Sequence, residues 1–185
     1  MPAKVIENAI PRSLVLAAEA AWPSPDWQYW HRYNGATANK YGSMDRSRIP
    51  PACIAALDAL ALAVTPYIGD SFIDYDLHAA GMHMMPPGGF LSRHLDAECH
   101  PIRPWRRTHS IVLSLSETLG GNLILEGVGK FAPEPGRVIV FETANQWHEV
   151  TRVSDDSSWR KTLALFAWQI DHNCDGGTAA NFQRS

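Results

Sequence analysis

From residue 72 onward, the pattern of the chain restricts the possible fold. Short runs rich in Ile, Val, Leu and Phe alternate there with turn signals such as Pro86-Pro87-Gly88-Gly89. Runs of this kind predict strands, near 72–85, 89–95, 107–116, 122–126, 130–132, 137–143, 146–152 and 160–170. Many short strands joined by tight turns favour a mainly β fold, a double-stranded β-helix or jelly roll.

Two helices are expected before these strands. The stretch from Pro11 to Trp22 is rich in Ala and Leu and has a proline at its start, as helix N-termini often do. Pro51 opens a second helix that runs from Ala52 to about Val64 with a buried apolar face. We expect both helices to pack on one sheet, and a short strand at 4–6. The aromatic residues of 26–50 are expected to form an irregular layer on the core or part of a substrate surface.

The length suits a single domain, since 185 residues with 45% hydrophobic content can bury a sizeable core. We predict one domain over 1–170, with a helical N-terminal part at 1–70 and a jelly-roll core at 72–170. The segment 171–185 is polar and contains glycine, so it is predicted to be a flexible tail.

Charge and cysteine content narrow the possible partners and compartment. The formal net charge of -3 argues against nucleic acid and against an anionic membrane surface as partners. No apolar run approaches the ~20 residues of a membrane span. The three cysteines are widely spaced and odd in number, which argues against a disulfide scaffold and fits a reducing, cytoplasmic location. The sequence does not indicate an oligomeric state.

A candidate metal site is suggested by His94, Asp96 and His148. His94 and Asp96 are two residues apart, so on a strand their side chains project to the same face. His148 follows a turn after the strand at 137–143, where the rim of a jelly roll would expose it to the cavity. Among the eight histidines, only His94 has a carboxylate two residues later. Two histidines and one carboxylate can hold one face of an octahedral metal and leave the other face open, as in non-haem Fe(II) sites.

A candidate anion anchor follows at Arg160-Lys161-Thr162. Arg160 and Thr162 share one face of the predicted strand, and Lys161 points to the other. A guanidinium beside a hydroxyl suits a carboxylate ligand. The alternative is an ordinary surface charge at the start of a strand.

The order of motifs resembles the Fe(II)/2-oxoglutarate-dependent dioxygenases, specifically the prolyl 4-hydroxylase-like branch of bacterial and viral proteins. The resemblance covers roughly 72–170 and rests on Pro87-Gly88-Gly89-Phe90, His94-Leu95-Asp96, Gly120-Gly121-Asn122-Leu123, Pro135-Gly136-Arg137-Val138-Ile139-Val140-Phe141, His148-Glu149-Val150 and Arg160-Lys161-Thr162-Leu163.

The resemblance implies roles for individual residues. His94, Asp96 and His148 would bind Fe(II), and Arg160, assisted by Thr162, would anchor the distal carboxylate of 2-oxoglutarate. With O2, such an enzyme hydroxylates an unactivated C–H bond and releases succinate and CO2. Halogenating relatives lack the carboxylate at the position of Asp96, so its presence favours hydroxylation. A peptidyl residue such as proline is the first substrate expected.

Two further features are open to more than one interpretation. Relatives often carry a tyrosine that touches 2-oxoglutarate near the position of Met85. His83 shares a face with Met85 and is an alternative contact to the co-substrate or a core histidine. The polar stretch 97–110 is predicted to be a loop overhanging the site. Its basic residues would attract an acidic substrate or remain solvated, and Trp105 would cover the substrate.

Other functions remain open at this stage. The substrate could be a free amino acid, a nucleobase or another small molecule instead of a protein or peptide. A metal-binding jelly roll without turnover and a hydrolytic or isomerising cupin-like metalloenzyme are the alternatives from other classes.

Overall fold

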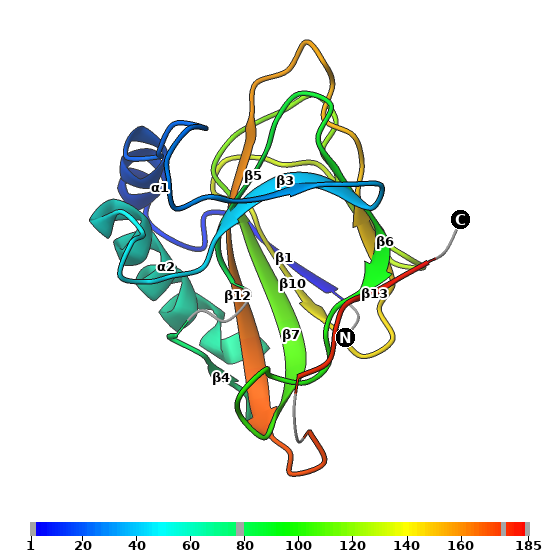
Figure 1. Ribbon diagram of the computed structural model, residues 1–185. Coiled ribbons are helices and arrows are strands. Elements are labelled where there is room, and N and C mark those ends of the chain that lie inside the picture. Colours follow the sequence, from blue (N-terminus) through cyan, green and yellow to red (C-terminus); the bar gives the residue numbers. More distant parts are fainter. Residues whose placement is uncertain (1–2, 77–79, 175–176, 184–185) are drawn as a thin grey trace.

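The computed structural model describes residues 3–76, 80–174 and 177–183. It shows a strongly curved antiparallel sheet with two helices packed on one side (Figure 1), and the predicted jelly-roll class is confirmed. The elements are β1 (Ala3–Ile6), α1 (Arg12–Ala20), β2 (His31–Asn34), β3 (Ala38–Ser43), α2 (Pro51–Val64), the 3-10 turn η1 (Thr65–Tyr67), β4 (Phe72–Ile73), β5 (Gly81–Met85), β6 (Phe90–Leu95), β7 (Trp105–Ser114), β8 (Leu123–Leu125), β9 (Gly129–Phe131), β10 (Val138–Glu142), β11 (His148–Val150), β12 (Arg160–Ile170) and β13 (Asn181–Phe182).

The strand order divides the sheet into two parts joined by β3. One part runs β1-β10-β7-β12-β5, and the other runs β6-β11-β8-β9. Strand β3 pairs with β6 through its first residues, Ala38 and Asn39, and with β5 through Tyr41, Gly42 and Ser43. The two parts curve toward each other, and the space between them is lined by residues of both.

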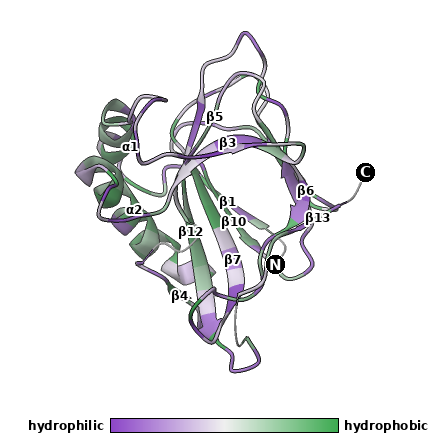
Figure 2. Cartoon of the chain, in the orientation of Figure 1, coloured by the Kyte–Doolittle hydropathy of each residue, from purple (hydrophilic) through white to green (hydrophobic). Residues whose placement is uncertain are grey.

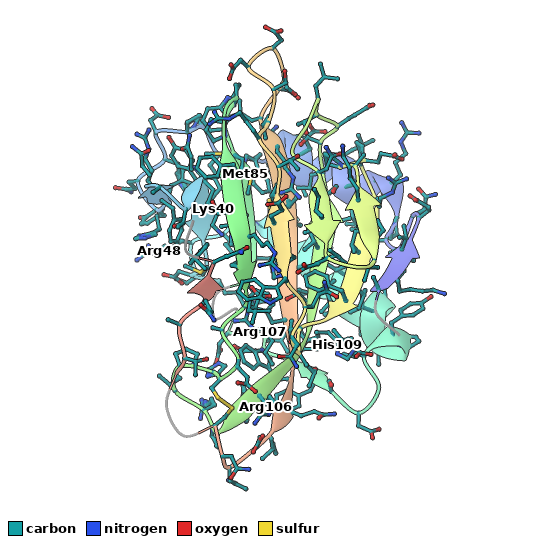
Figure 3. All side chains as sticks on the ribbon, turned by 90° about the vertical axis from the view of Figure 1, so that its right-hand side faces the viewer. Lys40, Arg48, Met85, Arg106, Arg107 and His109 are labelled. Atoms are coloured by element: carbon teal, nitrogen blue, oxygen red, sulfur yellow. A yellow bond between two sulfur atoms is a disulfide. The ribbon has the colours of Figure 1, made fainter. Side chains whose placement is uncertain are left out.

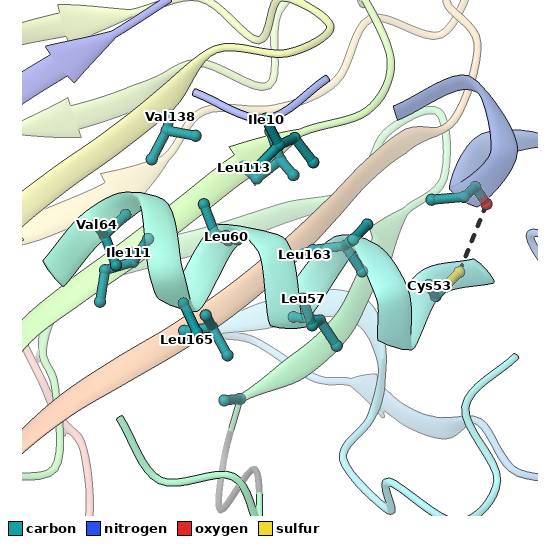
Figure 4. Packing of buried hydrophobic residues seen from close by; sticks show 14 of the residues in the cluster. Ile10, Cys53, Leu57, Leu60, Val64, Ile111, Leu113, Val138, Leu163 and Leu165 are labelled. Atoms are coloured by element: carbon teal, nitrogen blue, oxygen red, sulfur yellow. Dashed lines mark hydrogen bonds between the residues drawn. The ribbon is translucent and has the colours of Figure 1, made fainter. Parts of the chain in front are cut away.

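Helix α2 closes the outer side of the first part. Leu57, Leu60 and Val64 recur at helical spacing and are fully buried, and they meet Leu163 and other apolar side chains of the sheet (Figure 4). Figure 2 shows hydrophobic residues on the helices and on β12, where these elements meet. This layer leaves the opposite face of the sheet available for a polar site.

The N-terminal part was predicted to be helical apart from a short strand at 4–6; that strand is present as β1, and two further strands, β2 and β3, were not predicted. β1 pairs with β10, and β2 forms a hairpin with β3. The aromatic segment 26–50 does pack on the core, with the Trp30 ring 6.0 Å from Trp22 and 6.3 Å from Tyr41. It is not irregular throughout, however, since it contains β2 and β3. The single strand predicted at 72–85 is two strands, β4 and β5, and its residues 77–79 lie outside the described residues.

The C-terminal segment is attached to the sheet where a flexible tail was predicted. Cys174 forms a disulfide with Cys99. Farther along, Asn181 pairs with Leu95 and Phe182 with His94. The cysteine spacing argued against a disulfide scaffold, but two of the three cysteines are paired, so the cysteine content no longer supports a reducing compartment. Among the helices of the described residues, none has the length and apolar character needed to cross a membrane.

Candidate functional site

The residues of the predicted metal site converge between β6 and β11. His148 is directly opposite His94 in the antiparallel register, and the two imidazole centroids are 4.1 Å apart. Asp96 follows at the end of β6, with its Oδ1 3.6 Å from Nε2 of His94 and 3.7 Å from Nε2 of His148. One ligand atom from each of the three residues lies within 4.8 Å of the others, so a single ion can contact all three.

Both histidines are oriented by their backbones. Nδ1 of His94 lies 2.8 Å from the carbonyl oxygen of Ser92, and Nδ1 of His148 lies 3.0 Å from that of Gln146. A carbonyl oxygen only accepts hydrogen bonds, so each Nδ1 carries the proton and each Nε2 presents a lone pair to the site. Burial lowers the pKa of His148, against the opposing charge of Asp96, which favours the neutral form that metals bind.

The second carboxylate oxygen of Asp96 is held by two neighbours on β7. Ser110 Oγ donates to Asp96 Oδ2 at 2.6 Å, and the Arg107 guanidinium lies 3.4 Å from the same oxygen. Burial alone would raise the pKa of Asp96. Its contacts with His94, Arg107, His148 and Ser110 outweigh burial and hold the pKa of Asp96 below its usual range. The carboxylate is therefore ionised, with Oδ1 directed at the two imidazoles.

Arg107 was not expected to have this role: it was placed where a polar loop leads into a strand, as a basic residue that attracts substrate or stays solvated. The described chain forms strand β7 from Trp105 onward. Ser110 pairs with Phe166 and Arg107 with Trp168, so the strand carries an extra residue at Thr108. This β-bulge puts Arg107 on the same face as Ser110, which regular alternation would forbid. The buried guanidinium carbon also lies 3.6 Å from the centroid of the Phe166 ring.

Trp105 does not cover the site. Its ring packs edge-on against Phe72, with centroids 4.8 Å apart, and against His100 at 4.9 Å. Arg106, the neighbouring basic residue, forms an ion pair with Asp171 at 2.7 Å. The overhanging loop predicted at 97–110 thus ends at β7, and these two side chains serve packing rather than substrate contact.

The candidate metal site opens into a pocket of about 580 Å³ between the two parts of the sheet. Arg160 and Thr162 line it from β12, as predicted, whereas Lys161 faces α1 with its Nζ 3.7 Å from Glu19. Arg160 is buried, and its Nε donates to the carbonyl oxygen of Gly121 at 2.8 Å. A side chain on Gly121 would place a Cβ 2.8 Å from Cδ of Arg160, so the glycine leaves room for the arginine.

Arg160 is poised for an external anion. Burial lowers the pKa of its guanidinium to about 10, and among the described residues no carboxylate lies within ion-pair distance of it. At neutral pH it remains charged. A buried cation without a carboxylate partner is strongly favoured to bind an incoming carboxylate.

Strand β5 lies next to β12 and supplies His83 and Met85 to the same wall. His83 pairs with Thr162 and Met85 with Arg160 in the antiparallel register. Thr162 Oγ1 donates to the carbonyl oxygen of His83 at 3.4 Å. Both β5 side chains line the pocket, so the predicted shared face of His83 and Met85 is present.

The pocket also has residues that sequence reasoning missed. Tyr33 and Lys40 reach it from the β2–β3 hairpin, and Phe182 reaches it from β13. The Phe182 ring stacks on the imidazole of His94 with centroids 5.1 Å apart and planes 24° apart. The signal for Tyr33 was the aromatic content of 26–50, which pointed to a substrate surface without identifying Lys40, and Phe182 fell in the segment predicted to be a flexible tail.

Comparisons with known proteins agree with this geometry. Residues 80–168 match the sequence profile of the 2OG-Fe(II) oxygenase superfamily. The crystal structure of a Pseudomonas putida prolyl-4-hydroxylase superposes with a TM-score of 0.65 at 25% identity, covering 92% of each chain. The viral collagen prolyl hydroxylase of Paramecium Bursaria Chlorella virus-1, solved as a 2OG complex, gives 0.64 at 11% identity, covering 92% of this chain and 97% of that one.

A third similar structure contains a peptide. It is a prolyl hydroxylase from Trichoplax adhaerens in complex with a hypoxia inducible factor oxygen degradation domain peptide fragment, with a TM-score of 0.61 at 18% identity. The superposition covers 93% of this chain and 84% of that chain. No curated protein sequence matches the chain significantly.

The fold and the profile together define an oxygenase of the jelly-roll class. Residues 80–168 carry the profile of the 2OG-Fe(II) oxygenase superfamily, and the structures similar to this chain include prolyl 4-hydroxylases of bacterial and viral type. The chain is a 2-oxoglutarate-dependent dioxygenase, and the family uses Fe(II), 2-oxoglutarate and O2.

Proposed function

We propose that this enzyme hydroxylates a peptidyl residue, with proline as the first candidate, and releases succinate and CO2. In this proposal His94, Asp96 and His148 bind Fe(II), and Arg160 with Thr162 binds the distal carboxylate of 2-oxoglutarate. One observation carries it: three convergent ligand atoms line the same pocket as one buried guanidinium that has no carboxylate partner in the described part of the chain.

The residues present fit this metal. Two imidazole Nε2 atoms and one carboxylate oxygen leave part of the coordination sphere for other ligands. Fe(II) together with 2-oxoglutarate and O2 supplies the oxidising chemistry for an unactivated C–H bond. The protein's residues hold the ligand atoms in place, keep the Asp96 carboxylate ionised and offer Arg160 to an anion. The apolar wall around Met85 and Phe141 restricts water in the pocket.

The peptidyl substrate is supported by the structural neighbours. The Pseudomonas putida prolyl-4-hydroxylase covers nearly all of this chain at 25% identity, and the Trichoplax adhaerens neighbour was solved with a peptide. A pocket of about 580 Å³ lies within the usual range of ligand sites and has room for a keto acid beside one substrate side chain.

The mechanism is tested by anaerobic titration of the Fe(II)-loaded protein with 2-oxoglutarate. Chelation of the metal by the keto acid gives a visible charge-transfer band. We expect the band in the wild type and a loss of affinity of about 100-fold in Arg160→Met, because a buried charge-assisted pair is removed. Lys161→Met is the matched control, since Lys161 faces α1. No band in the wild type, despite bound metal, would contradict the proposed mechanism.

The substrate class is tested separately by mass spectrometry. The enzyme is incubated with Fe(II), 2-oxoglutarate and O2, together with proline-rich peptides in one arm and free amino acids in the other. We expect the peptide to gain one oxygen atom on proline, with succinate formed in equal amount. Oxygen gain only in the free amino acids would reject the peptidyl substrate and keep the oxygenase chemistry.

A further inference from the structure

The pocket contains more positive charge than its one carboxylate balances. Arg107, Arg160 and Lys40 all line it, and Asp96 is the only acidic residue among the lining residues. Arg107 is already paired with Asp96. Arg160 and Lys40 therefore remain as two cations without a carboxylate partner among the described residues.

Lys40 and Arg160 lie in one row across three adjacent strands. Tyr41 of β3 pairs with Met84 of β5. Extending this antiparallel register by one residue brings Lys40 opposite Met85, and both side chains line the pocket. Met85 in turn pairs with Arg160 of β12. Directly opposite residues of neighbouring strands project to the same face. Figure 3 labels Lys40 and Met85 on this side of the sheet.

The distance across this row suits a small dianion. Neighbouring strands are about 4.8 Å apart, so the backbones of Lys40 and Arg160 are separated by about 10 Å. The row places Met85, which offers no hydrogen-bond donor, between the two cations. Two long basic side chains can thus approach a ligand from β3 and from β12, on either side of an apolar strip.

The surroundings of Lys40 show that its amine points inward. Its Nζ lies 5.2 Å from the centroid of the Tyr33 ring. Burial lowers the pKa of Lys40, while the charge of Asp96 raises it and that of Arg160 lowers it. The amine is therefore in the field of both the metal-site carboxylate and the guanidinium. A ligand that spans these two groups passes beside it.

We propose that Lys40 is a second binding residue for 2-oxoglutarate, donating from β3 to the dianion that Arg160 holds from β12. The inference rests on the proposed function, since it deepens the same co-substrate site. Relatives often have a tyrosine that contacts 2-oxoglutarate near the position of Met85. In this proposal, Lys40 on the neighbouring strand β3 supplies the polar contact that Met85 cannot make. It also gives β3, which joins the two parts of the sheet, a direct role in co-substrate binding.

The test is the 2-oxoglutarate affinity of Lys40→Met, measured by anaerobic titration. Methionine keeps the unbranched apolar stem of lysine, with one heavy atom fewer, and removes the charge. We expect affinity to fall about 10- to 100-fold, as for loss of a hydrogen bond to a charged group. Affinity for Co(II), a metal probe measured without 2-oxoglutarate, should stay within about twofold of the wild type. Lys161→Met is the control for removing a lysine on the opposite side of the sheet.

Other results would overturn the proposal in distinguishable ways. If Lys40→Met binds 2-oxoglutarate like the wild type while Arg160→Met does not, Lys40 is not a co-substrate residue and the proposed function stands. If Lys40→Met loses Co(II) and 2-oxoglutarate affinity to the same extent, its role is structural. If the wild type itself does not bind 2-oxoglutarate, the proposed function fails first.

Discussion

The two carboxylate oxygens of Asp96 have different contacts. Oδ2 is held by Ser110 and Arg107, and Oδ1 faces the two histidine Nε2 atoms. Since the carboxylate is already oriented, a metal that binds here does not have to order it. Groups that orient ligands in this way usually affect metal affinity although they do not touch the metal.

Removing the hydroxyl of Ser110 should therefore weaken metal binding. We expect Ser110→Ala to lower Co(II) affinity about 10-fold, in the range typical of partners that orient metal ligands. The measurement is a competition titration against a chelator. Ser116→Ala is the control, because the Ser116 hydroxyl donates to Trp159 O at 3.0 Å, away from the metal site. Equal affinity losses in both variants would show that the Ser110 effect is not local.

The buried His148 should make the metal-free protein sensitive to acid. Its pKa is lowered from 6.5 chiefly by burial, so between its folded pKa and about 6.5 the unfolded chain holds the extra proton. The free energy of unfolding is therefore highest above about pH 6.5. It falls as the pH decreases from there to the folded pKa of His148, by at most about 1.4 kcal/mol per pH unit. Urea unfolding between neutral and mildly acidic pH measures the slope. His148→Asn should reduce it, and an unchanged slope would reject the assignment.

For single residues, the sequence was most informative where the candidate site depends on residues that are close together in the chain. The two-residue spacing of His94 and Asp96 and the alternation of Arg160 and Thr162 are local, and the structure places all four side chains in the pocket. Arg107 escaped prediction because the bulge at Thr108 reverses its face. A bulge is set by pairing with a distant strand, which the local pattern does not encode.

At the scale of elements, β3 is the main omission. Its sequence, Ala38–Ser43, has neither the β-branched residues nor the apolar alternation that predict a strand. It is a strand because β2, β5 and β6 all offer it hydrogen-bonding edges. By contrast, β6, β10 and β12 were placed within a residue or so of their observed bounds, since their own composition and flanking turns define them.

Strand β13 should contribute to the metal site through Phe182. The ring lies nearly parallel to the His94 imidazole and restricts its rotation. We expect Phe182→Ala to lower metal affinity severalfold, roughly 1 kcal/mol, the scale of one aromatic pair. Gln183→Ala is the control, because Gln183 pairs with Arg93 at 2.6 Å and not with a metal ligand. The metal affinities of both variants are measured by titration. If Phe182→Ala binds metal as tightly as Gln183→Ala, Phe182 does not contribute to the metal site.

For the whole molecule, the central fact is that the pocket lies between the two parts of the sheet. The three candidate metal ligands come from β6 and β11 or the residue after β6, and Arg160 comes from β12. A ligand that binds both the metal and Arg160 therefore connects the two parts. Within the described residues, β3 is the strand that pairs with both parts, so such a ligand adds another connection between them.

This arrangement predicts interdependent stabilisation by the metal and 2-oxoglutarate. Without metal, 2-oxoglutarate should shift the thermal midpoint little. With Co(II) bound, 2-oxoglutarate at 100 times its Kd should raise the free energy of unfolding by about 2.7 kcal/mol. For a chain of this size that is a rise of about 5 to 10 °C. Thermal unfolding followed by circular dichroism measures it. Equal shifts with and without metal would show that 2-oxoglutarate binds elsewhere.

The Cys99–Cys174 disulfide has a practical consequence for the preparation of this enzyme. Ferrous iron needs a reductant to stay ferrous in air, and thiol reductants also cleave disulfides, more slowly where both cysteines are buried, as Cys99 and Cys174 are. Cleavage would remove the covalent link between the segment after Asp96 and the segment that leads to Phe182. Samples kept with and without thiols would then be chemically different proteins at one wall of the pocket. Kinetic constants measured on them are comparable only when the oxidation state of these two cysteines is known.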